Sequence, residues 1–359
     1  MKLLIVLGGG AMLLIPLTPM NSSTQAQSFD RRAMLENIGN NIIMLAHADF
    51  LAQTEVFQQS PSLETLAMFQ GEWVETSLGW QWRKLFNFEH LLIYHSPIEK
   101  ASSSPVNTEF IEQTILGTAV IDEAFIEGSG SNVKGLPVLE YLLFTPEQDN
   151  KHLLQAFTNL RRLDYLVAVA ENLHRKAGEV YPYWLPEGKN YPETFVNAAG
   201  EGSNVRESVS MLTNQIASVV ENVIQMRLGL PLGKTTGGTP QPELAEGQLS
   251  NTTVLQIIVM LESEQQTFNG GEAFGLDDYL VFLNTEYPDK PLSVKINEQL
   301  DSIIVALADL EQPLEVAVIE QTDQVDTIYI SLRVLVRLIK SDIVGHLGVT
   351  ITFNDNDED

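Results

Sequence analysis

The stretch DQVDTIYISLRVLVRLIKSDIVGH, residues 323–346, decides the fold class of this chain. Its apolar side chains recur at intervals of three and four residues, which is the spacing of one face of an α-helix. That face holds Val325, Ile328, Tyr329, Leu332, Leu335, Val336, Ile339 and Ile343. Because Val334, Leu338 and Val344 add apolar groups on other faces, we predict a helix that is covered on several sides and lies at the centre of a helical core.

The same spacing predicts helices along most of the remaining chain. One begins after Asp30 as N-cap and one opens at Ser60–Pro61, and others cover about 108–127, 205–229, 253–267, 276–284 and 292–310. A further helix has its apolar stripe at 157–170 and ends before residue 181. Gly229 is expected to end its helix in the left-handed conformation. The Gly-, Pro- and Thr-rich residues 234–251 predict a long loop or linker. The β-like stretch GVTITF, residues 348–353, is isolated and predicts at most a short extension.

These elements predict an all-α protein of two up-down helical bundles with long loops and little or no strand. The segment YPYWLPEGKNYP, residues 181–192, lies between the two groups of helices. We therefore place an N-terminal bundle at 27–190 and a C-terminal bundle with an acidic tail at 191–359. GLPVLEYLLF (135–144) resembles GLDDYLVFL (275–283), which is weak evidence for an internal duplication.

The amino terminus predicts export. After Lys2, an apolar run from Leu3 to Leu17 is followed by polar residues and by a cleavage site after Ala26. The run is shorter than the ~20 apolar residues that a membrane-spanning helix needs. We interpret 1–26 as a cleaved signal peptide of a periplasmic or surface protein, and an uncleaved anchor is the alternative. No other segment is apolar enough to cross a membrane.

Charge and composition exclude several classes of function. The chain has 21 Lys and Arg against 47 Asp and Glu, a net charge of -26, so its surface repels nucleic acid and anionic membranes. It contains no cysteine, which excludes disulfides, thiolate metal sites and cysteine nucleophiles.

The residue that stands out chemically is Glu140, within the apolar stretch KGLPVLEYLLF, residues 134–144. A buried carboxylate is costly unless it is paired. One interpretation is a structural ion pair, for which Arg83, Arg162 and Arg227 are candidates because they lie in apolar helices. The other interpretation is a ligand-binding site.

KGLPVLEYLLF, RLGLPLGK, FGLDDYLVFLNTEYPDKPLS and the terminal LGVTITFNDNDED, in this order, resemble the imelysin-like family of bacterial extracytoplasmic proteins. The resemblance covers nearly all of the chain after the signal peptide. It implies two helical bundles, a periplasmic or outer-surface location and a link to iron uptake, with iron-uptake components as partners. Some members are classed as metallopeptidases.

The family motif GxHxxE falls on Gly135, Pro137 and Glu140, so a proline stands where the family has a histidine. Proline has no donor atom for a metal, and none of the six histidines precedes an acidic residue by three positions. The resemblance implies iron or another divalent metal at Glu140. It places a ligand site at Gly135, Pro137, Glu140 and Tyr141, with Arg83 and Arg227 as charged candidates.

Three functions remain open. The first is an extracytoplasmic protein associated with iron uptake that binds a metal or small ligand between the bundles without peptidase activity. The second is a metallopeptidase that uses Glu140 with ligands the sequence does not identify, and the third is a structural surface protein. Whether the chain is an enzyme stays open, and the missing histidine favours the absence of catalysis.

Overall fold

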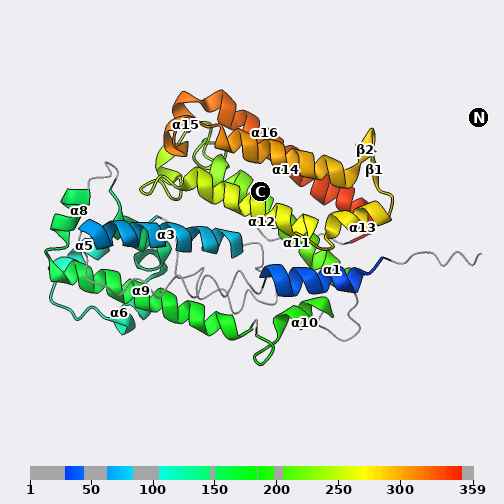
Figure 1. Ribbon diagram of the computed structural model, residues 1–359. Helices are drawn as coiled ribbons and strands as arrows, with labels where there is room; N and C mark the ends of the chain where they lie inside the picture. Colours follow the sequence, from blue (N-terminus) through cyan, green and yellow to red (C-terminus); the bar gives the residue numbers. More distant parts are fainter. Residues whose placement is uncertain are drawn as a thin grey trace, which may run out of the picture.

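The computed structural model describes residues 29–43, 63–83, 105–145, 150–183, 185–197 and 205–349. Within these ranges the chain is built almost entirely from helices (Figure 1). The first half holds α1 (Arg31–Asn37), η1 (Ile38–Ile43), α3 (Leu63–Arg83), α5 (Thr108–Leu116), α6 (Glu123–Glu127), η4 (Ser131–Val133), α7 (Leu136–Leu143), α8 (Asn150–Ala156), α9 (Leu160–Val180) and η5 (Tyr181–Tyr183).

The second half begins with α10 (Tyr191–Val196) and is also mostly helical. It holds α11 (Val205–Asn222), η6 (Val223–Gly229), η7 (Pro242–Leu244), α12 (Thr253–Asn269), α13 (Leu276–Phe282), α14 (Leu292–Ala308), α15 (Leu314–Glu320), α16 (Thr322–Arg337), η8 (Leu338–Ile343) and α17 (Val344–Leu347). The strands β1 (Glu286–Tyr287) and β2 (Lys290–Pro291) form a small antiparallel hairpin, which the sequence pattern missed because each strand has only two residues.

The buried apolar side chains form two clusters, one for each bundle. One cluster is made by α3 and α5 to α9, and the other by α10 to α17. Along the chain the two clusters divide between Ala177 and Tyr191, with one exception. Met34, Leu35 and Ile38, predicted to lie in the N-terminal bundle, pack in the second cluster. Figure 1 shows α1 beside α10 and α11, apart from α3 and α9.

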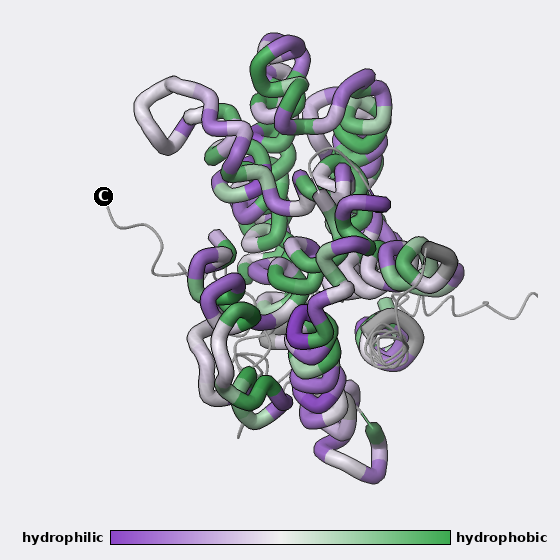
Figure 2. Tube along the Cα trace, turned by 90° about the vertical axis from the view of Figure 1, so that its left-hand side faces the viewer, coloured by the Kyte–Doolittle hydropathy of each residue, from purple (hydrophilic) through white to green (hydrophobic). Residues whose placement is uncertain are grey.

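The helix predicted over 323–346 is confirmed as the continuous run of α16, η8 and α17. Val325, Ile328, Leu332 and Leu335 are fully or almost fully buried in the second cluster. Asp30 caps α1, since its carboxylate accepts a hydrogen bond from the Ala33 N–H at 3.0 Å. Hydrophobic and hydrophilic residues alternate along many of the helices (Figure 2), as expected where one face of a helix is buried.

Two predicted helices differ from the structure. The helix expected over 108–127 is split, because α5 ends at the cap Gly117 and Asp122 caps a new helix, α6. Gly229 does not take the left-handed conformation, and positive φ occurs at Gly233 instead. Gly229 ends the π-helix η6, where a Cβ would lie 2.5 Å from the Ile224 carbonyl oxygen.

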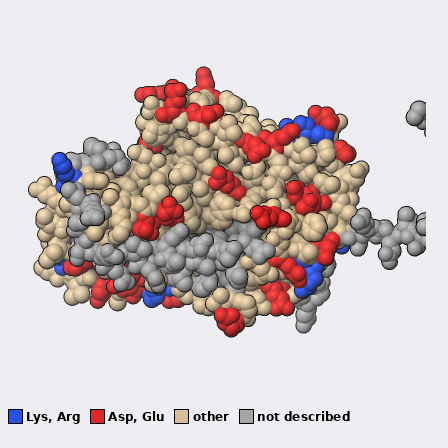
Figure 3. Space-filling model, in the orientation of Figure 1, with Lys and Arg blue, Asp and Glu red and all other residues tan. Residues whose placement is uncertain are grey.

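Several predicted features lie outside the described residues. These are the signal peptide, the Ser60–Pro61 helix start and most of GVTITF. Among the helices that are described, none has both the length and the apolar character required to span a bilayer. On the face in Figure 3, acidic side chains are spread widely and basic ones are few, which agrees with the net charge of -26.

Candidate functional site

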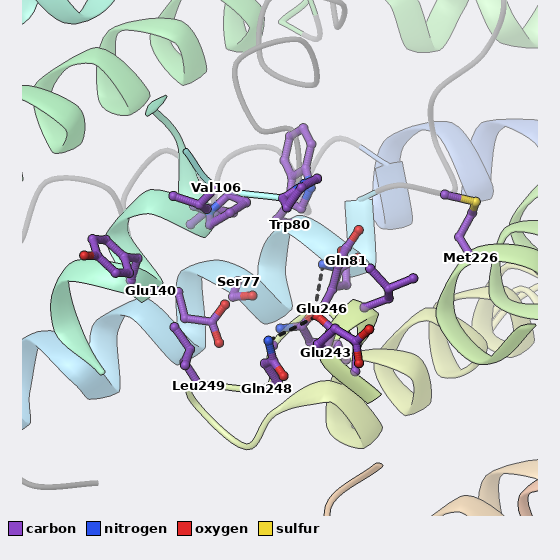
Figure 4. Close-up of a pocket in the computed structure, with 18 of the residues that line it drawn as sticks. Ser77, Trp80, Gln81, Val106, Glu140, Met226, Glu243, Glu246, Gln248 and Leu249 are labelled. Atoms are coloured by element: carbon purple, nitrogen blue, oxygen red, sulfur yellow. Dashed lines mark hydrogen bonds between the residues drawn. The ribbon is translucent and has the colours of Figure 1, made fainter. Parts of the chain in front are cut away.

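A pocket of about 640 Å³ lies where the two bundles meet. Side chains of α3 and α7 form its wall on one side, and η6, α12 and residues 243–249 form the other (Figure 4). Its lining is part apolar and part acidic: Trp73, Ser77, Trp80, Gln81, Pro105, Val106, Thr108, Leu136, Pro137, Glu140, Tyr141, Met226, Leu230, Glu243, Leu244, Ala245, Glu246, Gly247, Gln248, Leu249 and Gln256.

The start of α7 positions this wall. Gly135 has φ of 80°, a conformation that L side chains rarely adopt, and it is the N-cap of the helix. Pro137 lies in the first turn, where its missing N–H costs little. The indole nitrogen of Trp73 donates to the Leu136 carbonyl oxygen at 3.0 Å, which ties α7 to α3. The helix therefore enters the pocket with a fixed first turn, and Glu140 follows one turn later.

Glu140 is 8% exposed and accepts hydrogen bonds across the junction of the bundles. The Ser250 backbone N–H donates to its Oε1 at 2.9 Å and the Ser250 hydroxyl at 2.8 Å. Burial raises the pKa of Glu140, the Ser250 hydrogen bonds oppose this shift, and the nearby carboxylate of Glu246 adds to it. Glu140 is thus a buried acid of one bundle held by a loop of the other.

A chain of hydrogen bonds continues from Ser250 into the C-terminal bundle and back to α3. The hydroxyls of Ser250 and Thr252 are 2.8 Å apart, and the Gln256 amide nitrogen donates to Thr252 Oγ1 at 2.9 Å. The Gln81 amide nitrogen in turn donates to Gln256 Oε1 at 3.1 Å. The polar groups of this junction are therefore linked through side chains of α3, α7, α12 and the loop before α12.

Arg227 lies behind this layer. Its side chain is 1% exposed, donates to Gln256 Oε1 at 3.3 Å and forms an ion pair with Glu246, whose side chain is 42% exposed. Arg162 pairs with Glu112 at 2.7 Å. The interpretation of Glu140 as the ion-pair partner of Arg162 or Arg227 is therefore wrong. Arg83 is the last residue of α3, and its side chain lies outside the described part of the structure.

Tyr141 is held in the pocket wall by two polar contacts. Its hydroxyl donates to Glu112 Oε1 at 2.7 Å, and the Arg162 guanidinium lies 5.7 Å from the ring centroid. Burial and the hydrogen bond to Glu112 raise the pKa of Tyr141 to about 12, so the phenol keeps its proton at neutral pH. Tyr141 therefore contributes an uncharged aromatic ring to the pocket wall.

The described residues do not supply a metal centre. Nowhere within the described ranges do three or more His, Asp or Glu side chains form a group that could hold a metal ion. Pro137 has no donor, and Glu246 is engaged by Arg227. A metal at Glu140 thus lacks the three or four ligands that a protein zinc or iron site requires, and its presence stays a prediction.

The structure brings Pro137, Glu140 and Tyr141 to one wall, with Gly135 at the helix start and Arg227 behind the opposite wall. Residues 243–250 supply Ser250, Glu243 and Glu246 to the site, and none of the three was predicted because this segment has the composition of a linker. Trp73 and Trp80 are both buried, 2% and 5% exposed, and both also line the pocket.

Comparisons of the sequence and of the structure with known proteins point to the same family. The sequence model of the Imelysin family matches residues 45–335. A search of the curated proteins finds no match. An imelysin-like protein of Psychrobacter arcticum has a similar structure, with a TM-score of 0.71 at 14% identity over 90% of this chain and 97% of that one. A protein of Parabacteroides distasonis, described as an iron-regulated protein A precursor, gives 0.70 at 16% identity with the same coverage.

Proposed function

Because the chain belongs to the imelysin family, we propose that it is an extracytoplasmic binding protein associated with iron uptake, which takes a small ligand in the pocket between its bundles and has no peptidase activity. One observation carries the proposal. Glu140, at the acidic position of the family motif, lines a 640 Å³ pocket and is held there by Ser250 of the other bundle.

The volume and the lining of the pocket support ligand binding. Its volume falls within the roughly 300–1,000 Å³ that is usual for small-molecule sites. Its walls are mainly apolar, with a few polar groups among them, which is the composition that orients a ligand. The hydrogen bonds between the bundles hold those polar groups in place before a ligand arrives, so little ordering is required on binding.

Peptidase activity is disfavoured by the donor set. Zinc peptidases use the metal to activate water, and that chemistry requires protein ligands that leave one position open. The resemblance of residues 135–140 to the family motif puts Pro137 at the histidine position, and Glu140 accepts hydrogen bonds from Ser250. We expect purified protein to cleave a mixed peptide library no faster than buffer, with or without added zinc. Metal-dependent cleavage would favour the alternative metallopeptidase.

The link to iron is drawn from the family and from the neighbour described as an iron-regulated precursor. The direct test is whether iron regulates the amount of this protein. The amount of this protein is expected to rise when the producing cells are starved of iron and to fall when iron is restored. Quantitative immunoblotting measures this, and an amount independent of iron would remove this part of the proposal.

Export is tested at the amino terminus. We expect the mature protein outside the cytoplasm to begin near Gln27, because the apolar run 3–17 followed by Ala26 has the pattern of a cleaved signal. Amino-terminal sequencing of the exported protein measures this directly. Recovery of Met1 would instead identify the uncleaved anchor.

The role of Glu140 is tested by Glu140→Gln. The amide oxygen can still accept both Ser250 hydrogen bonds, and burial already disfavours the charge, so the melting temperature should change little. Ligand binding should fall, because the charge facing the pocket is lost. Melting and binding are measured side by side. A large drop in melting temperature with unchanged binding would make Glu140 structural.

The pocket itself is tested by blocking it. Met226 lines the pocket and is 48% exposed, so Met226→Trp should fill space there without disturbing a core. Native mass spectrometry of the exported protein is expected to detect a bound small molecule in the wild type and not in this variant. Ile330→Trp, on the solvent face of α16, is the matched control. Equal occupancy in all three proteins would place the ligand elsewhere.

A further inference from the structure

We propose that the ligand is an elongated organic dication, a molecule with two protonated amino or guanidino groups joined by an apolar chain. This inference rests on the proposed function and names the chemical class that the pocket selects. It is carried by three features of the lining: hydrogen-bond acceptors without a basic side chain, aromatic walls, and carboxylates that lie apart.

The first feature is an excess of acceptors. Three carboxylates, those of Glu140, Glu243 and Glu246, line the pocket, and no Lys, Arg or His is found among the described residues of the lining. Arg227 compensates the charge of Glu246 from behind, where its side chain is 1% exposed. Glu140 and Glu243 remain without such a partner in the described structure. An anionic ligand would meet only like charge here.

The lining also contains an acceptor of a different kind, which is independent of the three carboxylates. Gln81 is 4% exposed, and its Oε1 has no hydrogen-bond partner among the described residues. Its amide nitrogen donates to Gln256, and the oxygen points away from that bond (Figure 4). A buried carbonyl oxygen without a partner costs free energy, and a ligand N–H removes that cost.

The second feature is the aromatic and apolar wall between these acceptors. Trp73, Trp80 and Tyr141 line the pocket, together with Met226, Leu230 and Leu249. Tryptophan and tyrosine rings attract cations through their faces, and the apolar side chains suit a hydrocarbon linker. A small inorganic cation would make no use of these surfaces.

The third feature is the spacing of the carboxylates. Glu140 and Glu243 lie apart across the pocket (Figure 4), and within the described residues no three acidic or histidine side chains converge on one point. A single metal ion needs converging ligands. Two charges at the ends of a chain match separated carboxylates, so the same spacing that disfavours a metal favours a dication.

The test uses calorimetric titration of the mature full-length protein with putrescine, cadaverine and spermidine. Butanediol, which has the length of putrescine without its charges, is the matched neutral probe, and zinc chloride is the metal probe. We expect at least one of the amines to bind, and butanediol to bind at least about tenfold more weakly than putrescine. Zinc should show no saturable site.

Two variants assign the binding to the pocket. Glu243 is exposed at the pocket wall, so Glu243→Gln should keep the fold and weaken amine binding about tenfold. Glu320→Gln, an exposed acid of α15 outside the pocket, should leave it unchanged. Equal weakening by both variants would show diffuse attraction by the net charge and would overturn the proposal.

The remaining outcomes separate this inference from the proposed function. Equal binding of putrescine and butanediol, or saturable binding of zinc in place of the amines, would overturn the dication. If no amine binds but Met226→Trp still removes a copurified molecule, the pocket function stands and the ligand class is wrong. If no amine binds and no molecule copurifies, both proposals fail.

Discussion

Leu335→Ala is expected to lower the free energy of unfolding by about 2–5 kcal/mol, the range for a leucine truncated inside a packed core. Leu335 is fully buried in the cluster shared by α11, α14 and α16. Removal of its methyl groups loses burial and leaves a cavity that neighbouring helices fill only in part. Urea denaturation followed by circular dichroism measures the change.

Ile330→Ala is the control for this prediction. Ile330 lies on the same helix but is 59% exposed, so its truncation should change the free energy of unfolding by less than about 0.5 kcal/mol. Equal effects of the two substitutions would show that α16 is not buried at the centre of the C-terminal bundle. A near-zero effect of Leu335→Ala would contradict the same assignment.

The second large effect is expected at Glu264, and it is stabilising. This residue of α12 is 1% exposed, and neither carboxylate oxygen has a hydrogen-bond partner among the described residues. Leucine has a similar volume and no polar group to desolvate. Glu264→Leu should therefore raise the free energy of unfolding at neutral pH by about 1–4 kcal/mol, as when other buried charged groups are replaced by apolar ones.

The gain from Glu264→Leu should depend on pH. Burial raises the pKa of Glu264 well above its ordinary value of 4.5, so the folded chain holds this proton more tightly than the unfolded chain. The stability of the wild type then falls as pH rises from about 4.5 toward the raised pKa, and the variant has no such loss. Urea midpoints at pH 4.5 and pH 7 measure the difference, with Glu262→Leu, an exposed neighbour, as control. A gain that shrinks with rising pH would contradict this account.

Most of the helical architecture could be predicted from the sequence. The spacing of apolar residues placed α12, α14 and the helix over 323–346 within a few residues of their ends, because each buries one face in a core. The break between α5 and α6 escaped prediction, because the apolar spacing continues across Gly117 while the cap at Asp122 restarts the helix. The spacing of apolar residues alone does not show where one helix ends and the next begins.

The candidate site could be predicted only in part. Glu140 stood out because an acid in an apolar helix requires a partner. The partner itself, Ser250, is 110 positions away in a segment of loop composition, and no local pattern connects the two. For the same reason Arg227 was recognised as a buried cation, whereas its partner Glu246 was not. Contacts between the bundles depend on how the two bundles pack together. The residue pattern within one bundle does not predict that packing.

The π-helix η6 has an evolutionary consequence. A π segment contains one residue more per turn than the α-helix around it, so it corresponds to a single inserted residue. The wider turn absorbs that residue, so the chain beyond it keeps its orientation relative to α11. Loss of one codon within 223–229 is therefore expected to return the segment to α geometry and to leave Leu230 facing the pocket. A one-residue deletion within the regular helix α11 would instead rotate everything after it by about 100°, so the chain should tolerate a deletion in η6 better than one in α11.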